Sequence, residues 1–403
     1  MATPLTPAQI AVVKATAPVL KEHGETITTL FYKNMIGGNP ELRHIFNEAN
    51  QVGGAQPRAL AGAVFAYATY VDDLAKLGAA VERIAHKHAS LNVQPEQYAI
   101  VGKFLLEAVA TVLGDACTPE IGEAWTAAYA VLAEIFINRE HQIYVAFENW
   151  TGWRRFKIQK KVAESSEITS FYLAPEDGLA LPKFLPGQYI SLQLYIPKLG
   201  IRQPRQYSLS DAPGSDYYRI SVKKEAGKQV EMPGLISNML HNDFNEGDVV
   251  ELTHPAGEFF VKTEEETPIV LVSAGVGITP MISILNSAVA AGSSRNISLI
   301  HGARSSEVGA FADTLKRASE KPHVQTTVFL STLKDNEVRG VDYDFEGHVN
   351  LEDVGPERLF TNDPTTNYYV CGPLPFMTDI QQYLVGQGVD QDRVHLEIFG
   401  VGN

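Results

Sequence analysis

The sequence predicts a multidomain protein with an all-α domain, an antiparallel β-barrel domain and an α/β domain built on a parallel sheet, in that order. Its 403 residues exceed the about 250–300 at which one hydrophobic core stops growing. Apolar residues follow helical spacing from Thr6 to about Phe147, strand spacing from Trp153 to about Lys262, and alternating strand and helix patterns from Thr267 onward. The expected domains are 1–148, 153–263 and 264–403, with a linker at 149–152.

The first domain is expected to be helical throughout. Ala-rich runs such as Ala59 to Tyr70 and Val101 to Val112 have helical spacing and almost no strand-like alternation. Helix starts are marked by Thr6-Pro7, Gln94-Pro95 and Thr118-Pro119, because a proline in the first turn lacks only an N–H that would have no helical partner there.

The second domain has the pattern of a barrel. Short β-branched and aromatic runs, such as Tyr189 to Ile196 and Tyr217 to Val222, are separated by turn dipeptides that include Pro186-Gly187 and Pro213-Gly214. Such regular spacing is typical of an antiparallel barrel.

The third domain alternates strands with helices, which predicts a parallel sheet covered by helices. The expected strands are Ile269 to Ser273, Ile297 to His301, Val324 to Leu330, Tyr368 to Cys371 and Val394 to Ile398.

Composition excludes several classes of function. The formal charge is -14 and there is no basic stripe, so we expect no nucleic-acid partner. The one short basic cluster, Arg154 to Lys161, is interrupted by Phe156 and Ile158 and is interpreted as a solvated strand face. Two cysteines suit a reducing compartment, and no apolar stretch approaches the about 20 residues of a membrane span. Because the polar start of the chain lacks a signal-peptide pattern, we expect a cytoplasmic protein without a transmembrane segment.

His88 is the candidate metal ligand of the helical domain. Helical spacing places it on the apolar face of its helix, whereas His86 lies about 200° around, so only one of the two is expected to face the interior. A neutral imidazole in an apolar, aromatic-rich helical domain is what an axial haem ligand requires. The alternative is an ordinary core histidine.

The residues around His88 resemble the globin half of the flavohaemoglobins. The matching positions are Phe31-Tyr32, Pro40 to Asn47, Gln56, Leu60, Lys87-His88 and Tyr98. The resemblance implies that His88 is the proximal ligand of the haem iron. It further implies a haem pocket lined by Phe46, Leu60 and Lys87.

On the distal side, the resemblance implies that Tyr32 is the hydrogen-bond donor to the bound gas, with Gln56 as a second hydrogen-bonding group. A phenol O–H aimed at bound O2 stabilises the charge that develops on the terminal oxygen. Tyr32 is alternatively a core tyrosine bonded to backbone. Gln56 is alternatively a helix N-cap, because Pro57 follows it.

On the proximal side, the resemblance places Glu140 and Tyr98 beside His88. A carboxylate that accepts a hydrogen bond from the imidazole orients the ring and raises its basicity, which favours redox chemistry over storage of the gas. The alternatives are a solvated charge for Glu140 and ordinary helix packing for Tyr98.

The second domain carries a flavin motif. Arg205-Gln206-Tyr207-Ser208 follows a strand and matches the Arg-x-Tyr-Ser pattern of ferredoxin-reductase-like proteins. In that family the tyrosine stacks on the flavin, the serine approaches the polar edge of its ring, and the arginine binds the pyrophosphate. The segments around Tyr189 and Ser237 resemble the other flavin-contacting strand and the phosphate loop. The alternative is a plain barrel with coincident turns.

The third domain carries nicotinamide motifs. A glycine-containing turn after an apolar strand lets a pyrophosphate approach the helix N-terminus. The glycine turn predicts Gly275, Val276, Gly277, Ile278, Thr279 and Pro280 as NAD(P) residues, and the resemblance to the reductase family adds Cys371, Gly372, Pro373, Ile398 and Gly400. Cys371 is alternatively a small buried residue.

The C-terminal segment resembles the Glu-x-Phe-Gly of flavohaemoglobins, which implies that Glu397 and Phe399 contact the flavin. Val401 stands where the family usually has proline. Arg304-Ser305 either holds the 2′-phosphate of NADPH or caps the next helix, so the choice between NADH and NADPH stays open.

The resemblance spans about Thr6 to Gly400. It implies a nitric oxide dioxygenase, an NAD(P)H-dependent enzyme of nitric oxide detoxification in which FAD reduces haem b and haem-bound O2 oxidises nitric oxide to nitrate. We expect a monomer whose partners are O2, nitric oxide and NAD(P)H; whether a lipid or an azole-type ligand occupies the distal pocket is left open. The alternatives are a haem-based sensor or carrier and a flavin reductase for external acceptors. Lys87 and Glu397 are candidates for the junction between haem and flavin.

Overall fold

The computed structural model describes residues 3–46, 54–147, 150–227 and 234–400. The chain divides into two compact units. The first comprises Met1–Trp153, Gln193–Arg205 and Gly400–Asn403, and the second comprises Arg154–Leu192 and Gln206–Phe399. Within the described ranges, every helix is too short or too polar to cross a lipid bilayer.

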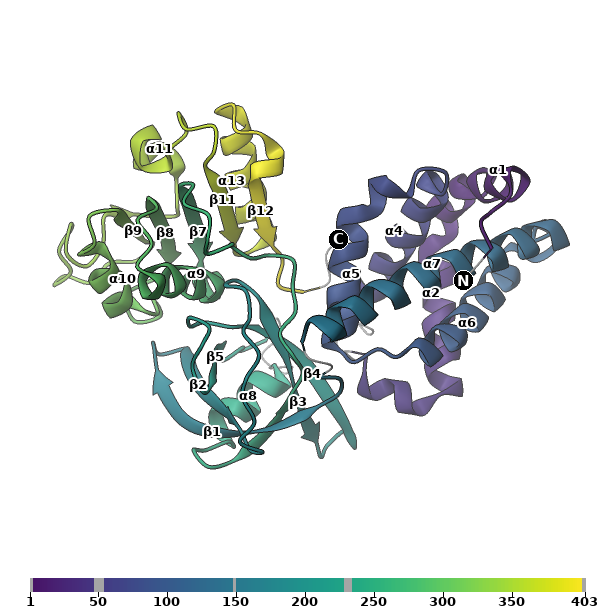
Figure 1. The fold of residues 1–403 in the computed structure, drawn as a ribbon, viewed down its shortest axis with the longest axis horizontal. Helices are drawn as coiled ribbons and strands as arrows, with labels where there is room; N and C mark the ends of the chain where they lie inside the picture. The colour runs from purple at the N-terminus through teal and green to yellow at the C-terminus, as the bar shows by residue number, and fades with distance from the viewer. Residues whose placement is uncertain (1–2, 47–53, 148–149, 228–233, 401–403) are drawn as a thin grey trace. The chain divides into compact units, whose positions relative to one another are not determined.

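In the first unit, the described residues up to 147 are helical, as the spacing of their apolar residues predicts (Figure 1). Its α-helices are α1 (Pro7–Ala15), α2 (Ala17–Gly38), α4 (Ala55–Tyr70), α5 (Gly78–Ser90), α6 (Pro95–Leu113) and α7 (Pro119–Ala146), with short 3-10 turns η1 (Pro40–His44), η2 (Leu74–Leu77) and η3 (Gly114–Ala116). All three predicted proline starts are confirmed. The Thr6 side chain accepts from the N–H of Gln9, and the Thr118 side chain accepts from the N–H of Ile121.

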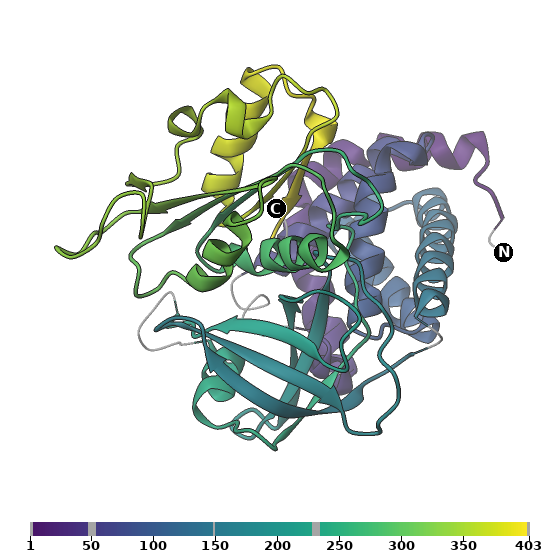
Figure 2. The same ribbon diagram turned by 60° about the vertical axis from the view of Figure 1, so that its left-hand side comes forward.

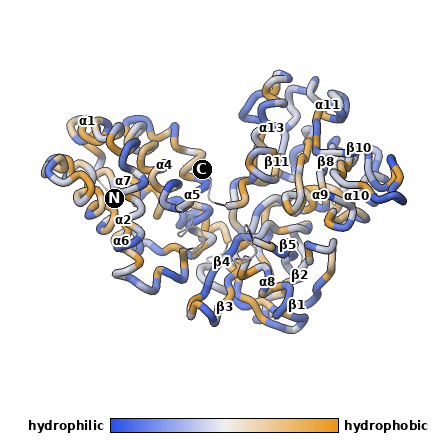
Figure 3. The backbone as a smooth tube through the Cα atoms, turned by 180° about the vertical axis from the view of Figure 1, so that it is seen from behind, coloured by the Kyte–Doolittle hydropathy of each residue, from blue (hydrophilic) through white to orange (hydrophobic). Residues whose placement is uncertain are grey.

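The helical core includes large side chains from α2, α4 and α7. Phe31 and Met35 of α2 pack with Tyr67 of α4 and Trp125 of α7. Tyr67 is 2% exposed, and its hydroxyl donates to the Ala128 carbonyl at 2.8 Å, which satisfies the one polar atom of this ring. Hydrophobic and hydrophilic stretches alternate along these helices (Figure 3), as expected when one face of each helix is buried.

The antiparallel sheet has the strand order β4-β3-β6-β1-β2-β5. Its strands are β1 (Arg154–Ala163), β2 (Ile168–Pro175), β3 (Tyr189–Ile196), β4 (Ile201–Ser208), β5 (Tyr218–Lys223) and β6 (Val249–Leu252), and α8 (Leu235–Asn242) follows β5. Phe156 and Ile158 of β1 are fully buried, which confirms the predicted alternation.

Lys161 departs from the solvated strand face predicted for β1. Its Nζ donates to the carbonyls of Phe244 at 2.5 Å and of Leu240 and His241 at 3.3 Å. These carbonyls lie at the end of α8, where a cation also complements the helix dipole. The sequence pattern could not predict this contact because α8 is about 80 positions away in the chain.

The second sheet has the order β10-β9-β8-β7-β11-β12, and each of its adjacent strand pairs is parallel. Its strands are β7 (Ile269–Ala274), β8 (Ile297–Ala303), β9 (Val324–Leu330), β10 (Phe345–Glu346), β11 (Asn367–Cys371) and β12 (Val394–Glu397). The five predicted strands are thus confirmed, with ends shifted by at most two residues. The two-residue β10 was not predicted.

Helices cover both faces of the parallel sheet, as predicted. Its helices are α9 (Ile278–Ala291), α10 (Ala312–Ser319), α11 (Leu351–Val354), α12 (Pro356–Leu359) and α13 (Leu374–Gly386). Leu271 of β7 packs with α9 and α10, whereas its neighbour Val272 packs with α11, α12 and α13. Figure 2 shows α13 (yellow) and α9 (green) on opposite sides of the sheet. The carboxyl ends of the strands are therefore left as the edge at which a ligand binds.

Candidate functional site

His88 of α5 lies in a hydrogen-bonded cluster with Tyr98 of α6 and Glu140 of α7. Its Nδ1 is 2.8 Å from Oε1 of Glu140 and 2.9 Å from the Tyr98 hydroxyl. The Tyr98 hydroxyl also donates to Oε1 of Glu140 in a short hydrogen bond. The structure thus brings together the three residues that the sequence predicted on the proximal side.

The electrostatics of this cluster determine which nitrogen of His88 is available. Glu140 is only 2% exposed. Burial, reinforced by the charge of Glu140, raises the pKa of Tyr98 well above its usual range, so the phenol stays protonated and donates. With the carboxylate accepting from Nδ1–H, the Nε2 lone pair of His88 is left free to bind a metal. The ring also packs on Phe136, at 5.6 Å between centroids.

The expectation that only one of the two neighbouring histidines faces the interior is wrong. His86 is 8% exposed, and its Nε2 lies 3.8 Å from Oε2 of Glu82. Arg139 of α7 makes a bidentate pair with the same carboxylate, at 2.6 and 2.8 Å. A polar network from α7 thus covers this side of α5, which helical spacing alone assigned to solvent.

The distal candidates also lie together. Tyr32 of α2 is 8% exposed, its ring lies 5.5 Å from that of Phe46, and its hydroxyl is hydrogen-bonded to the side chain of Gln56. Burial raises the pKa of Tyr32 well above its usual range, so it remains a donor. Leu60 belongs to the same apolar cluster.

Gln56 is not the helix N-cap that Pro57 suggested. α4 begins at Ala55 and is capped by Gly54, which has a φ of 68° that favours glycine. Gln56 therefore lies in the first turn, from which its side chain reaches Tyr32. The Thr28 hydroxyl donates to the Pro57 carbonyl at 2.8 Å and fixes this turn against α2.

Most of the predicted flavin residues lie in β4 and at the start of β3. Gln206 donates from Nε2 to the Ser191 hydroxyl at 2.9 Å, Ser208 is buried, and Tyr207 is half-buried. Arg205 is half-buried and donates from Nη1 to the Pro204 carbonyl at 2.6 Å. Tyr189 is held by paired backbone hydrogen bonds with Ala256.

The start of α8 fits a phosphate group. Ser237 lies in its first turn, where its hydroxyl donates to the Gly234 carbonyl and accepts from the Glu225 N–H. A Cβ at Gly234 would come within 2.8 Å of that hydroxyl, so glycine is required for this close packing. The first turn carries no acidic residue, and its N–H groups would suit an anion.

The two nicotinamide motifs meet at the carboxyl edge of the parallel sheet. Cys371 pairs in register with Ser273 of β7 and with Glu397 of β12. A Cβ at Gly277 would lie 2.6 Å from the carbonyl carbon of Cys371 and 3.0 Å from the N of Gly372. The glycine loop, comprising η4 (Gly275–Gly277), is therefore in direct backbone contact with the Cys-Gly-Pro turn.

The remaining residues of this edge are placed as follows. At the start of α9, three residues are buried: Ile278, Thr279 and Pro280. Val276 is half-buried and packs against the core cluster that contains Ile278. Pro373 directly precedes α13. Cys371 is fully buried, and burial raises the pKa of its thiol, which suits a small packed residue and disfavours a nucleophile.

The tail after β12 is less covered. Phe399 is 47% exposed, Ile398 packs on the core cluster of α13, and Gly400 has a φ of 137°. Val401 lies outside the described residues.

Lys87, the haem-pocket candidate on α5, is half-buried next to His88.

The capping alternative for Arg304-Ser305 is wrong. The next helix, α10, begins only at Ala312 and is preceded by Phe311 as its N-cap. Arg304 instead forms an ion pair with Glu167 in the turn between β1 and β2. Sequence reasoning missed Glu167, because this residue lies 137 positions before Arg304 and belongs to no recognisable motif.

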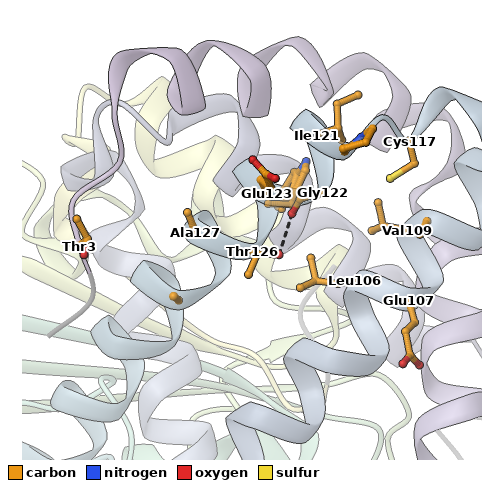
Figure 4. Close-up of a pocket in the computed structure, with 14 residues that line it drawn as sticks. Thr3, Leu106, Glu107, Val109, Cys117, Ile121, Gly122, Glu123, Thr126 and Ala127 are labelled. Carbon is orange, nitrogen blue, oxygen red and sulfur yellow. Dashed lines mark hydrogen bonds between the residues drawn. The ribbon is translucent and has the colours of Figure 1, made fainter.

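One cavity of the first unit is lined by none of the predicted site residues. A cavity of about 840 Å³ lies between α6 and α7, with Leu106, Val109, Ile121 and Trp125 on its walls (Figure 4). A hydrogen bond from Thr126 to the Gly122 carbonyl stays within α7. The walls are mainly apolar, so this cavity offers little recognition chemistry.

Comparison with known proteins agrees with this arrangement. The Globin family matches residues 29–136, and the Oxidoreductase NAD-binding domain family matches residues 271–382. The chain is 50% identical to the Flavohemoprotein of Bordetella pertussis, over 99% of both chains. Among solved structures, it is similar to the flavohemoglobin from Malassezia yamatoensis with bound FAD and heme, at 28% identity and a TM-score of 0.86, covering 99% of this chain and all of that one. It also resembles the FAD/NAD binding domain of nitric oxide dioxygenase from Vibrio cholerae, at 36% identity and a TM-score of 0.55 over 61% of this chain and 98% of that one.

Proposed function

The chain belongs to the flavohaemoprotein family, and from this we propose that it is a nitric oxide dioxygenase, which uses electrons from NAD(P)H to convert nitric oxide and O2 to nitrate. It is an NAD(P)H-dependent oxidoreductase with a globin and a reductase module. The proposal includes three domains at the boundaries predicted from the sequence, a monomeric state and a cytoplasmic location.

The residues present fit haem, FAD and a nicotinamide nucleotide. His88 would hold the haem iron through Nε2, beside an apolar wall that includes Phe46 and Leu60. Arg205, Gln206, Tyr207, Ser208, Tyr189, Ser237, Glu397 and Phe399 would contact FAD, and the glycine loop with the Cys-Gly-Pro turn, Ile398 and Gly400 would contact NAD(P). Bound FAD supplies a carrier that takes the two electrons of a hydride and releases them one at a time, as the haem iron requires.

The observation that carries the proposal is the carboxylate on the proximal histidine. Glu140 accepts from Nδ1–H and is itself held by the Tyr98 hydroxyl, so the imidazole has a defined orientation and increased basicity. A strongly donating ligand favours oxidation chemistry over reversible storage of a gas. Tyr32, kept protonated by burial and hydrogen-bonded to Gln56, would supply a donor to a gas bound at the iron.

The test is to measure nitric oxide consumption by the purified, haem- and FAD-loaded protein with NADH or NADPH, with and without O2, together with the nitrate formed. We expect one nitrate per nitric oxide, and consumption only when both O2 and nucleotide are present. His88→Ala should abolish consumption and haem retention while leaving flavin reduction intact.

Two results would contradict the proposal. Rapid reduction of an external acceptor without reduction of the protein's own haem would favour a reductase, and haem that NAD(P)H never reduces would favour a sensor or carrier. Lys87→Met tests the junction hypothesis in the same assay. Unchanged electron transfer from flavin to haem in that variant would exclude Lys87 from the path.

A further inference from the structure

The loop that follows β8 lies where the adenosine ribose of a dinucleotide is recognised. In sheets of this kind the pyrophosphate binds at the turn after the first strand, here β7, and the ribose 2′ position lies at the end of the next strand, here β8. The loop begins with Arg304 and is pinned to the end of β9, since the N–H of Ser331 bonds to the Ala303 carbonyl at 3.1 Å and that of Thr332 to the Arg304 carbonyl at 2.8 Å.

A turn of the antiparallel sheet packs directly against this loop. Ser166, between β1 and β2, donates from both its N–H (2.9 Å) and its hydroxyl (3.0 Å) to the carbonyl of Glu307. The next residue, Glu167, is fixed at both ends of its backbone: its N–H bonds to the Ser165 hydroxyl at 3.3 Å, and its carbonyl accepts from the Lys224 N–H at 2.8 Å. The turn thus presents the Glu167 carboxylate from an ordered backbone.

That carboxylate pairs with one nitrogen of the Arg304 guanidinium. Nη2 of Arg304 donates to Oε1 of Glu167; in this pair the Arg304 side chain is 69% exposed and that of Glu167 is 31% exposed. The same loop carries a second ion pair, between Glu307 and Lys334 at 2.8 Å, and the Ser306 side chain is hydrogen-bonded to Glu337. These contacts bring three carboxylates together with two cations.

We propose that Glu167 selects NADH over NADPH, by pairing with Arg304 at the end of β8, where a 2′-phosphate would bind, and by adding a negative charge there. The inference rests on the proposed use of a nicotinamide nucleotide. A 2′-phosphate carries close to two negative charges. It binds best to an arginine whose guanidinium can donate two parallel hydrogen bonds to it. Here it would compete with the Glu167 carboxylate for Nη2 of Arg304, whereas the 2′-hydroxyl of NADH requires no such exchange.

The experiment compares flavin reduction by NADH and by NADPH in the full-length, FAD-loaded protein, by anaerobic stopped-flow absorbance below nucleotide saturation. We expect the wild-type second-order rate constant to be at least about tenfold greater for NADH, the factor that corresponds to one charge-assisted hydrogen bond. In Glu167→Gln the constant for NADPH should rise about tenfold, and that for NADH should change less than about twofold.

Two further variants make the assignment specific. Glu176→Gln removes a matched carboxylate that pairs with Arg155 in the same sheet, with Nε 2.5 Å from Oε2, and should leave both constants unchanged. The double variant Glu167→Gln, Arg304→Gln should lose the gain with NADPH, because the freed guanidinium is then absent.

The inference is overturned if wild type uses both nucleotides equally, if Glu167→Gln does not raise the NADPH constant, or if the gain survives removal of Arg304. A normal NADH reaction in these cases leaves the proposed function standing. If neither nucleotide reduces the flavin of the wild-type protein, the proposed function fails, and the inference fails with it.

Discussion

Gly277→Ala should disrupt the contact between the glycine loop and the Cys-Gly-Pro turn. Gly277 has φ -61° and ψ -7°, a conformation open to any residue, so the backbone does not require glycine here. The requirement is steric: an added Cβ would overlap the Cys371 carbonyl oxygen and lie 2.6 Å from its carbonyl carbon. Ordinary carbon contacts are about 3.5–4.0 Å, so the overlap is about 1 Å.

This overlap cannot be relieved by rotating a side chain, because the atoms it meets are backbone. Cys371 is held in register with Ser273 of β7, the strand from which the glycine loop itself begins. Either the loop or the sheet must therefore move, and the overpacking should lower the free energy of unfolding of the second unit by about 1–3 kcal/mol. The entropy gained by replacing glycine offsets only about 0.4–1 kcal/mol.

The assay is urea unfolding of the full-length variant, with anaerobic flavin reduction by NADH as the functional measurement. The matched control is Gly386→Ala in α13, where a Cβ meets nothing within 4 Å, and which should be neutral or slightly stabilising. We expect Gly277→Ala to slow hydride transfer at least about tenfold, since a 1 Å displacement at a reacting site has a large effect. If Gly277→Ala unfolds within about 0.5 kcal/mol of the control and reacts at the wild-type rate, the close packing has no such role.

Three further predictions follow from the buried polar groups. Tyr32→Phe should speed O2 dissociation from the reduced haem several-fold, the effect of losing one hydrogen bond of about 1 kcal/mol, and an unchanged stopped-flow rate would remove Tyr32 from the mechanism. Glu140→Gln should retain haem but lower nitric oxide turnover at least about tenfold and weaken the iron–histidine vibration in Raman spectra, whereas an unaltered vibration would argue against tuning by the carboxylate. Burial lowers the pKa of His301 from 6.5 to about 4, so between these values the unfolded chain binds a proton that the folded chain does not. Stability should therefore fall as the pH drops from 6.5 to 4, by up to about 3 kcal/mol, and a His301→Asn variant with the same pH dependence would contradict this.

The sequence predicted the secondary structure well because its signals are local. A proline after Thr6, Gln94 or Thr118 specifies a helix start through backbone geometry within one turn, and all three helices begin there. Strand spacing predicted both end residues of β3 correctly, since alternation with period two is a property of the segment itself. The N-cap alternative for Gln56 is wrong because a glycine two positions earlier in the chain, Gly54, caps α4 instead.

By itself, then, the amino-acid order determined three kinds of architecture and their succession, and it predicted His88, Tyr32 and the glycine loop as the groups that carry the chemistry. Tertiary structure decided which distant side chains meet. It buried His86 beside Glu82, which pairs with Arg139, placed Lys161 on the end of α8, and joined Glu167 to Arg304 across 137 positions. The physical reason is that helix and strand patterns act through neighbouring dihedral angles, whereas ion pairs and close backbone contacts depend on how whole elements pack, which no local window of sequence contains.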